Sequence, residues 1–121
     1  MADVKGRFRR SISRWASSDD LEAKELRSDT ARSGCCMIAE AEDRDHVDLQ
    51  GSLRTVTLRP RGGVPALEAE LYDGSGVITL IWLGRRRIAG IEPGRSLKVA
   101  GRIGVQDRTR VMYNPRYELR S

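Results

Sequence analysis

The sequence predicts an all-β fold: a small closed barrel of five strands, with a short helix between the third and fourth strands and a helical extension at the N-terminus. Three observations support this prediction. Apolar and polar residues alternate with a period of two through most of the chain after His46, as in half-buried strands. The turn Asp73-Gly74-Ser75-Gly76 supplies residues that tolerate the positive φ angles of a hairpin. The segment 84–91 has room for about two turns of helix.

The first predicted strand begins near His46 and is long and bent. Its apolar residues stand at odd positions from Val47 to Leu53, and then at even positions, Val56 and Leu58. A slip of one residue sends side chains to the opposite face unless a bulge or a sharp bend absorbs it. We therefore expect the strand to bend in its middle and to pair at both ends of the barrel.

Four further strands are predicted after the loop 60–65, whose prolines and glycines end the first strand. They cover residues 67–72, 77–83, 97–105 and 109–113. The third strand, 77–83, is apolar on both faces, so we expect it to be central. Asn114-Pro115 interrupts the last ladder because proline has no N–H to donate, and residues 116–119 finish the chain.

The N-terminal residues 1–45 are predicted to form a helical or partly disordered extension, with the barrel in residues 46–121. Within the extension, Phe8, Ile12 and Trp15 have the spacing of one helix face, and arginines occupy the other faces. This pattern indicates a basic amphipathic arm.

A second helical segment is predicted from Asp19, because Asp19 and Glu22 have the spacing of a capping box. It runs to about Arg27 and has only a thin apolar stripe. Two arrangements are open. The helix packs over one end of the barrel, or it binds a partner or a second copy of the chain through residues 8–27.

Positive charge is concentrated in the predicted barrel. The chain carries 22 Lys+Arg against 17 Asp+Glu, a formal net charge of +5. Residues 51–121 hold 13 basic and 6 acidic side chains, a net charge of +7. Nearly all the basic residues are arginines, whose planar fork matches phosphate and whose plane stacks on bases. A GC-rich genome would also raise the arginine content.

No membrane or secretory segment is predicted. The longest apolar stretch, 77–83, is far shorter than the roughly 20 residues that cross a bilayer. No uninterrupted apolar region follows the N-terminal arginines, as a secretory signal would require. Cys35 and Cys36 are adjacent, so a disulfide between them would be strained and free thiols are expected. We therefore expect a cytoplasmic protein.

Catalytic and metal-binding signatures are weak. His46 is the only histidine, and it stands between Asp45 and Asp48 in an acidic stretch. With the two adjacent cysteines it cannot make a zinc set, which needs about four ligands at a recognisable spacing. Gly74-Ser75-Gly76 lacks the lysine of a phosphate-binding loop. We expect no enzyme activity, no metal and no cofactor.

The pattern from residue 67 onward resembles a known family. Residues 67–82, Leu-Glu-Ala-Glu-Leu-Tyr-Asp-Gly-Ser-Gly-Val-Ile-Thr-Leu-Ile-Trp, are followed by Pro93-Gly94, by Val-Ala-Gly-Arg at 99–102 and by Asn-Pro-Arg-Tyr-Glu at 114–118. Together they resemble bacterial oligonucleotide/oligosaccharide-binding (OB-fold) domains, such as helicase-wedge and anticodon-binding domains, and small actinobacterial OB-fold proteins of this length. The resemblance covers roughly residues 46–119 and indicates the fold better than the ligand.

The resemblance implies a non-enzymatic protein that binds single-stranded DNA or RNA through a basic groove over the second and third strands and their flanking loops. Such a groove combines positive charge with aromatic rings, and each stacked base is worth about 1–3 kcal/mol. The candidate nucleic-acid-binding residues are Arg59, Arg61, Tyr72, Arg85, Arg86, Lys98, Arg102, Arg108 and Arg110. Trp82 alternates with Ile78 and Leu80, which favours a place in the core over a role as a stacking platform.

One feature of the same pattern opposes this function. Glu68 and Glu70 share the outward face with Tyr72, and carboxylates beneath a phosphate backbone would repel it. The alternative hypothesis is therefore a protein-interaction or oligomerisation module that uses the barrel and the amphipathic arm. The placement of the basic candidates discriminates between the two, since one continuous stripe favours nucleic acid and scatter favours a protein partner.

Overall fold

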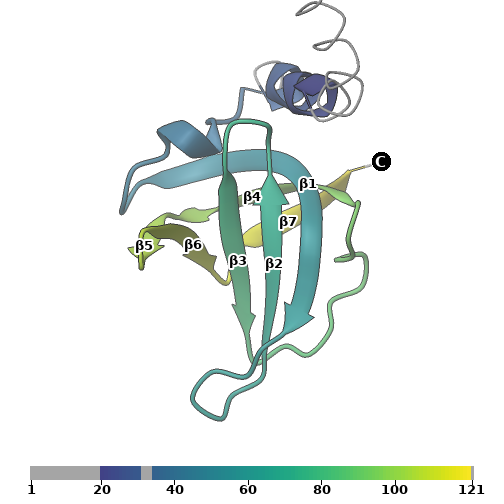
Figure 1. Cartoon of the computed structure of the whole chain (residues 1–121). Coiled ribbons are helices and arrows are strands. Elements are labelled where there is room, and N and C mark those ends of the chain that lie inside the picture. The colour runs from purple at the N-terminus through teal and green to yellow at the C-terminus, as the bar shows by residue number, and fades with distance from the viewer. Residues whose placement is uncertain (1–19, 31–33, 121) are drawn as a thin grey trace, which may run out of the picture.

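The computed structural model of the chain describes residues 20–30 and 34–120, and most of the described chain is β-structure (Figure 1). The strands are β1 (His46–Leu58), β2 (Ala66–Tyr72), β3 (Val77–Leu83), β4 (Ser96–Arg102), β5 (Gly104–Gln106), β6 (Thr109–Tyr113) and β7 (Arg116–Arg120). A 3-10 helix, η1 (Ile38–Glu40), precedes them, and residues 20–30 are α-helical. The all-β fold class is confirmed for this part of the chain.

The strands form one sheet in the order β5-β6-β3-β2-β1-β4-β7. β3 and β6 run parallel, and the other neighbours are antiparallel. β3 lies between β2 and β6, so its predicted central position is confirmed. The hydrogen-bonded ladder ends at β5 and β7, and the expectation of a closed ring of five strands is wrong.

The ladder stays open because the predicted fourth strand, 97–105, is interrupted at Ile103, and Asn114-Pro115 separate β6 from β7 as predicted. Gly104 pairs with Val111, and pairing resumes between Ala100 and Arg116. We call the segment of β4 and β5 the β4–β5 arm, and the segment of β6 and β7 the β6–β7 arm. Between the two pairs, three residues of the β4–β5 arm, 101–103, therefore stand opposite four residues of the β6–β7 arm, 112–115. An extra residue on one arm is the mark of a β-bulge, which disrupts the ladder locally.

The predicted helix between the third and fourth strands is also wrong. Residues 84–95 are turns, bends and irregular backbone. Gly84 and Gly90 have φ angles of 75° and 84°, and backbone in this left-handed region cannot continue a right-handed helix. Ile88 and Ile91 still turn into the core, so the segment covers the core without helical structure.

The predicted bend of the first strand is confirmed (Figure 1). The first half of β1 pairs with β4 and the second half with β2, and the register with β2 shifts between Leu53 and Thr55. Gly51 lies just before this shift, where a Cβ atom would meet the carbonyl of Tyr72. Glycine at this position lets the two backbones approach.

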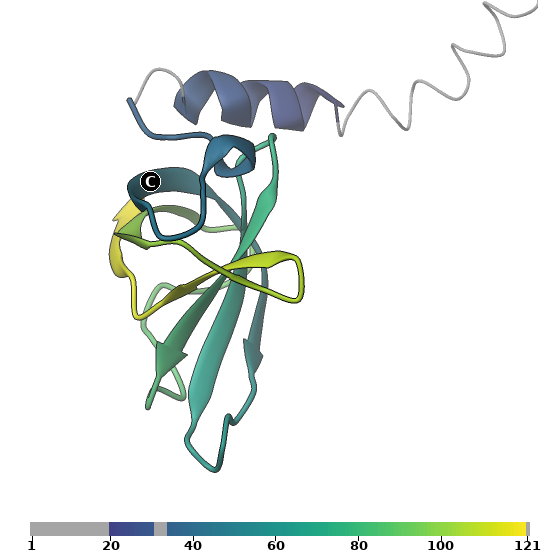
Figure 2. The same cartoon turned by 90° about the vertical axis from the view of Figure 1, so that its left-hand side faces the viewer.

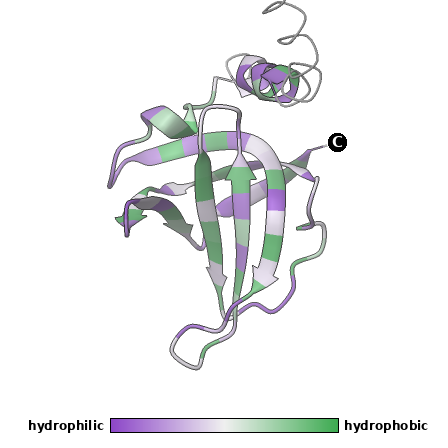
Figure 3. Cartoon of the chain, in the orientation of Figure 1, coloured by the Kyte–Doolittle hydropathy of each residue, from purple (hydrophilic) through white to green (hydrophobic). Residues whose placement is uncertain are grey.

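The core lies inside the curved sheet, and the alternation of apolar and polar residues is visible along the strands (Figure 3). Trp82 is 5% exposed, which confirms its core position. Its Nε1 donates to the carbonyl of Pro115 at 3.1 Å, and Tyr117 packs edge-on against its ring. Asn114 has a φ of 49°, and its Oδ1 accepts from the N–H of Leu83 at 2.9 Å. These contacts tie the corner between β6 and β7 to β3.

The helix over residues 20–30 packs across one end of the sheet, at the turn between β2 and β3 (Figure 2). Arg27 donates to the carbonyl of Gly74 at 2.9 Å, and Ala23 and Thr30 are buried. A Cβ atom on Gly74 would meet the carbonyl of Ala23, so this glycine permits the close approach. The arm at Phe8, Ile12 and Trp15 lies outside the described residues.

Asp73 anchors the segment that joins this helix to β1. The carboxylate is fully buried and accepts from the N–H of Ile38 at 2.8 Å. It also accepts from the N–H and the hydroxyl of Ser75 and from the N–H of Gly76. No described helix is long and apolar enough to cross a membrane.

Candidate nucleic-acid interface

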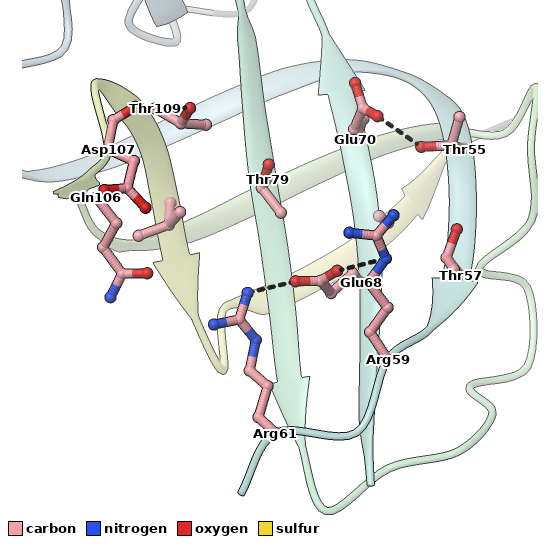
Figure 4. Close-up of a pocket in the computed structure, with 12 residues that line it drawn as sticks. Thr55, Thr57, Arg59, Arg61, Glu68, Glu70, Thr79, Gln106, Asp107 and Thr109 are labelled. Carbon is pink, nitrogen blue, oxygen red and sulfur yellow. Dashed lines mark hydrogen bonds and ion pairs between the residues drawn. The ribbon is translucent and has the colours of Figure 1, made fainter.

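A groove of about 390 Å³ crosses the outer face of β1, β2 and β3 (Figure 4). The connection between β1 and β2 and the turn between β5 and β6 contribute to its walls. Its lining residues are Thr55, Thr57, Arg59, Arg61, Glu68, Ala69, Glu70, Thr79, Gln106, Asp107, Thr109 and Val111. The groove lies on the face that the sequence predicted for a ligand.

The floor of the groove is polar because the side chains of each strand alternate between the outer face and the core. Thr55 of β1 stands opposite Glu70 of β2, which stands opposite Thr79 of β3. Thr57 and Glu68 form the next row. Because residues two apart in a strand share a face, these side chains point outward while their neighbours fill the core.

The carboxylate of Glu68 is neutralised inside the groove. Nη2 of Arg61 donates to its Oε1 at 2.5 Å, and Nε of Arg59 lies 3.6 Å from its Oε2. The Glu68 side chain is 12% exposed, whereas that of Arg59 is 71% exposed. The hydrogen bond to Glu68 raises the pKa of Arg61, so the guanidinium stays charged. Glu70 accepts a hydrogen bond from the Thr55 hydroxyl at 3.0 Å.

The lining side chains nevertheless carry slightly more negative than positive charge. Arg59 and Arg61 supply two positive charges, and Glu68, Glu70 and Asp107 supply three negative ones, a net charge of −1. The floor is therefore suited to hydrogen bonding with neutral donors and acceptors more than to a phosphate backbone.

Tyr113 of β6 links the two walls of the groove. Nη1 of Arg61 donates to its hydroxyl at 3.3 Å, and that hydroxyl donates to Oε1 of Gln106 at 3.1 Å. The Arg61 guanidinium lies 5.9 Å from the ring centroid, and the tyrosine is 38% exposed. Sequence reasoning missed Tyr113, although it shares a strand face with the polar residue Thr109.

The ring of Tyr72 is in contact with Arg54. The guanidinium of Arg54 stacks over its ring at 3.7 Å from the centroid, a cation–π contact that covers one face. The tyrosine is half-buried and does not line the groove. Arg54 was not among the predicted residues.

Arg110 holds η1 and the residue after it against the sheet. Its Nε donates to the carbonyl of Ala41 and its Nη2 to the carbonyl of Ala39, both at 3.0 Å. Two of its donors are therefore bound to backbone carbonyls. Arg108 stands in the turn between β5 and β6, exposed and with a φ of 64°.

The remaining basic candidates lie outside the groove. Arg85 and Arg86 are exposed in the connection between β3 and β4. Lys98 and Arg102 point outward from β4, where they line two other hollows. The structure thus brings Arg59 and Arg61 together, and it does not join the basic candidates into one stripe.

The thiols and acidic side chains form no metal site in the described residues. No group of three or more His, Cys, Asp and Glu side chains in residues 20–30 and 34–120 could hold a metal ion. Cys35 and Cys36 are free and half-buried. Burial raises the pKa of the Cys36 thiol, and the carboxylates of Glu40 and Asp45 add to the shift.

Comparison of the chain with models of known protein families finds no match, and comparison with curated protein sequences finds none either.

Proposed function

We propose that the protein binds single-stranded nucleic acid, without chemistry, in the groove over β1, β2 and β3. The carrying observation is the neutralisation of Glu68 by Arg59 and Arg61, because it removes much of the repulsion that a carboxylate on this face would exert on a phosphate backbone. A cytoplasmic location belongs to the same proposal.

An OB-like arrangement of the strands supports the proposal. β1 pairs with both β2 and β4, and β3 pairs in parallel with β6. Only Ile103 separates β4 from β5 in the chain, yet β5 is the first strand of the sheet order and β4 the sixth of seven, so the sheet must curl. We propose that this curled sheet is a divergent OB-like barrel, an architecture whose outer face commonly binds oligonucleotides.

The binding mode follows from the charges of the groove. The threonine hydroxyls and the Glu70 carboxylate would meet base edges, since carboxylates accept from the amino group of cytosine. The phosphates would lie at the rim, near the exposed guanidinium of Arg59. Each phosphate neutralised contributes about 0.7 to the salt slope for single strands. Two rim arginines therefore predict a shallow salt dependence.

Fluorescence anisotropy with labelled single-stranded DNA and RNA at low salt tests the proposal. The double variant Arg59→Ala/Arg61→Ala should bind about tenfold or more weakly, because it removes the two positive charges of the groove and leaves the carboxylate of Glu68 to repel the phosphates. Arg85→Ala/Arg86→Ala removes the same charge away from the groove and should bind like the native chain. No binding to either nucleic acid at tens of micromolar protein would overturn the proposal, and so would equal losses in the two variants.

A protein-interaction module is the competing function. The scatter of the basic candidates and the net charge of −1 in the groove favour it. Light scattering of the full chain over a range of concentrations tests self-association. A mass that rises above 13.5 kDa, together with no nucleic-acid binding, would support this function. A constant monomer mass would contradict self-association.

A further inference from the structure

The interruption between the β4–β5 arm and the β6–β7 arm leaves a second hollow in the surface. It has a volume of about 480 Å³. Gly101 and Arg102 line it from β4, and Tyr113, Asn114 and Arg116 line it from the opposite arm. The hollow thus lies where 101–103 stand opposite 112–115 without ladder pairing.

A third hollow of about 340 Å³ continues along the same face, over β1, β4 and β7. The two hollows share Asp48, Ala100 and Arg116. Ala100 pairs with Asp48 on one side and with Arg116 on the other, so a small side chain stands between two long ones. The result is a shallow floor with a charged rim.

The cations on this face are free, in contrast to those of the groove. Lys98, Arg102 and Arg116 take part in no ion pair within the described parts of the chain, whereas Arg59 and Arg61 are both committed to Glu68. Arg102 uses only its Nε, which donates to a backbone carbonyl at 3.3 Å.

The net charge of this face is positive. Lys98, Arg102 and Arg116 stand against Asp48 and Glu118, which leaves +1 before any charge on His46. Unpaired guanidinium groups offer bidentate donors to phosphate oxygens.

Tyr113 connects the second hollow to the groove. It lines the second hollow, and its hydroxyl is bonded to Arg61 and Gln106, which line the groove. Tyr117, 40% exposed, lines the third hollow. Tyr113 therefore stands where the groove meets the face that carries the free cations.

We infer that a single strand bound in the groove continues past Tyr113 onto the face of β1, β4 and β7, with its phosphates on Arg102 and Arg116. This inference rests on the proposed function and extends it to a second, adjoining surface. Tyr113 offers a ring for one base at the boundary, and the shallow floor at Ala100 lets the backbone lie close to the sheet.

The length of the bound strand tests the inference. Anisotropy titrations would use labelled oligo-dT of about 6 and about 18 nucleotides, which bracket the roughly 4–16 nucleotides that one OB fold covers. The native chain should bind the long oligomer at least about tenfold more tightly than the short one, because only the long one reaches the second surface.

The variant Arg102→Ala/Arg116→Ala should lose this preference for length while it binds the short oligomer like the native chain. Its salt slope on the long oligomer should fall by about 1.4, the value for two phosphate contacts to a single strand. Arg85→Ala/Arg86→Ala is the control of equal charge. Both altered residues of the test variant are exposed at their side chains, and circular dichroism checks that the fold is retained.

The outcomes separate the two proposals. If both oligomers bind but the affinity does not depend on length, or if Arg102→Ala/Arg116→Ala binds the long oligomer like the native chain, the inference is wrong and the groove remains. If neither oligomer binds the native chain, the proposed function itself has failed.

Discussion

Replacement of Asp73 by alanine tests the anchoring of the N-terminal segments on the sheet. In the native chain the buried carboxylate accepts from three backbone N–H groups and one hydroxyl, contributed by Ile38, Ser75 and Gly76. Alanine removes every acceptor at once. The N–H of Ile38 then loses its partner in a fully buried position.

The expected loss of stability follows from those bonds. A buried donor left without a partner costs about 1–3 kcal/mol, and a hydrogen bond to a charged group contributes about 1.5–3 kcal/mol. Ser75 and Gly76 are half-buried, so water replaces part of what their N–H groups lose. We expect Asp73→Ala to lower the free energy of unfolding by about 3–5 kcal/mol. For a domain of this size that loss lowers Tm by more than about 10 °C.

Urea denaturation followed by circular dichroism measures the change. Asp73→Asn keeps one carbonyl acceptor and should cost less, about 1–3 kcal/mol. Asp43→Ala removes the same charge from an exposed turn and should be close to neutral. A loss below about 1 kcal/mol for Asp73→Ala would refute the reasoning, because it would mean that the buried donors find other partners.

Three further changes test other parts of the structure. Gly74→Ala places a Cβ at a φ of 89° and against the carbonyl of Ala23, so it should destabilise the protein by about 1–2 kcal/mol or more. It should also speed hydrogen exchange in residues 20–30, and unchanged exchange would contradict the packing of this helix on the turn between β2 and β3. Trp82→Phe loses the bond to the Pro115 carbonyl and should cost about 1–3 kcal/mol in urea denaturation, and a neutral result would show that the carbonyl is satisfied otherwise. Because the pKa of the Cys36 thiol is raised, a smaller fraction of it is thiolate at pH 8 than of an ordinary cysteine thiol. Iodoacetamide, followed by mass spectrometry, should therefore label Cys36 more slowly than a model thiol at that pH, and equal rates would contradict the shift.

Much of the strand pattern could be predicted because alternation is a local property of the chain. The phase slip between Leu53 and Val56 predicted the bend of β1, and the structure has a register shift at that point. The sequence could not exclude a helix in residues 84–91, because the segment is long enough for about two turns. The positive φ angles of Gly84 and Gly90, which are incompatible with a right-handed helix, depend on how the segment packs over the core.

The candidate site was predicted only in part. Arg59 and Arg61 follow β1 directly, so their place at the end of that strand could be predicted from the sequence. Their neutralisation of Glu68 depends on how the connection after β1 folds back over β2. The role of Arg110 depends on carbonyl groups about 70 residues earlier in the chain, at Ala39 and Ala41.

By itself the sequence determined most of the strand segments and the bend of the first strand, because each follows from the order of apolar and polar residues over a few positions. Only the tertiary structure decided which charges are paired and which are free. Arg61 meets Tyr113 across 52 positions, and Arg102 and Arg116 line one hollow from the two sides of the interrupted ladder. Contacts of this kind depend on strand pairing, and no local pattern specifies them.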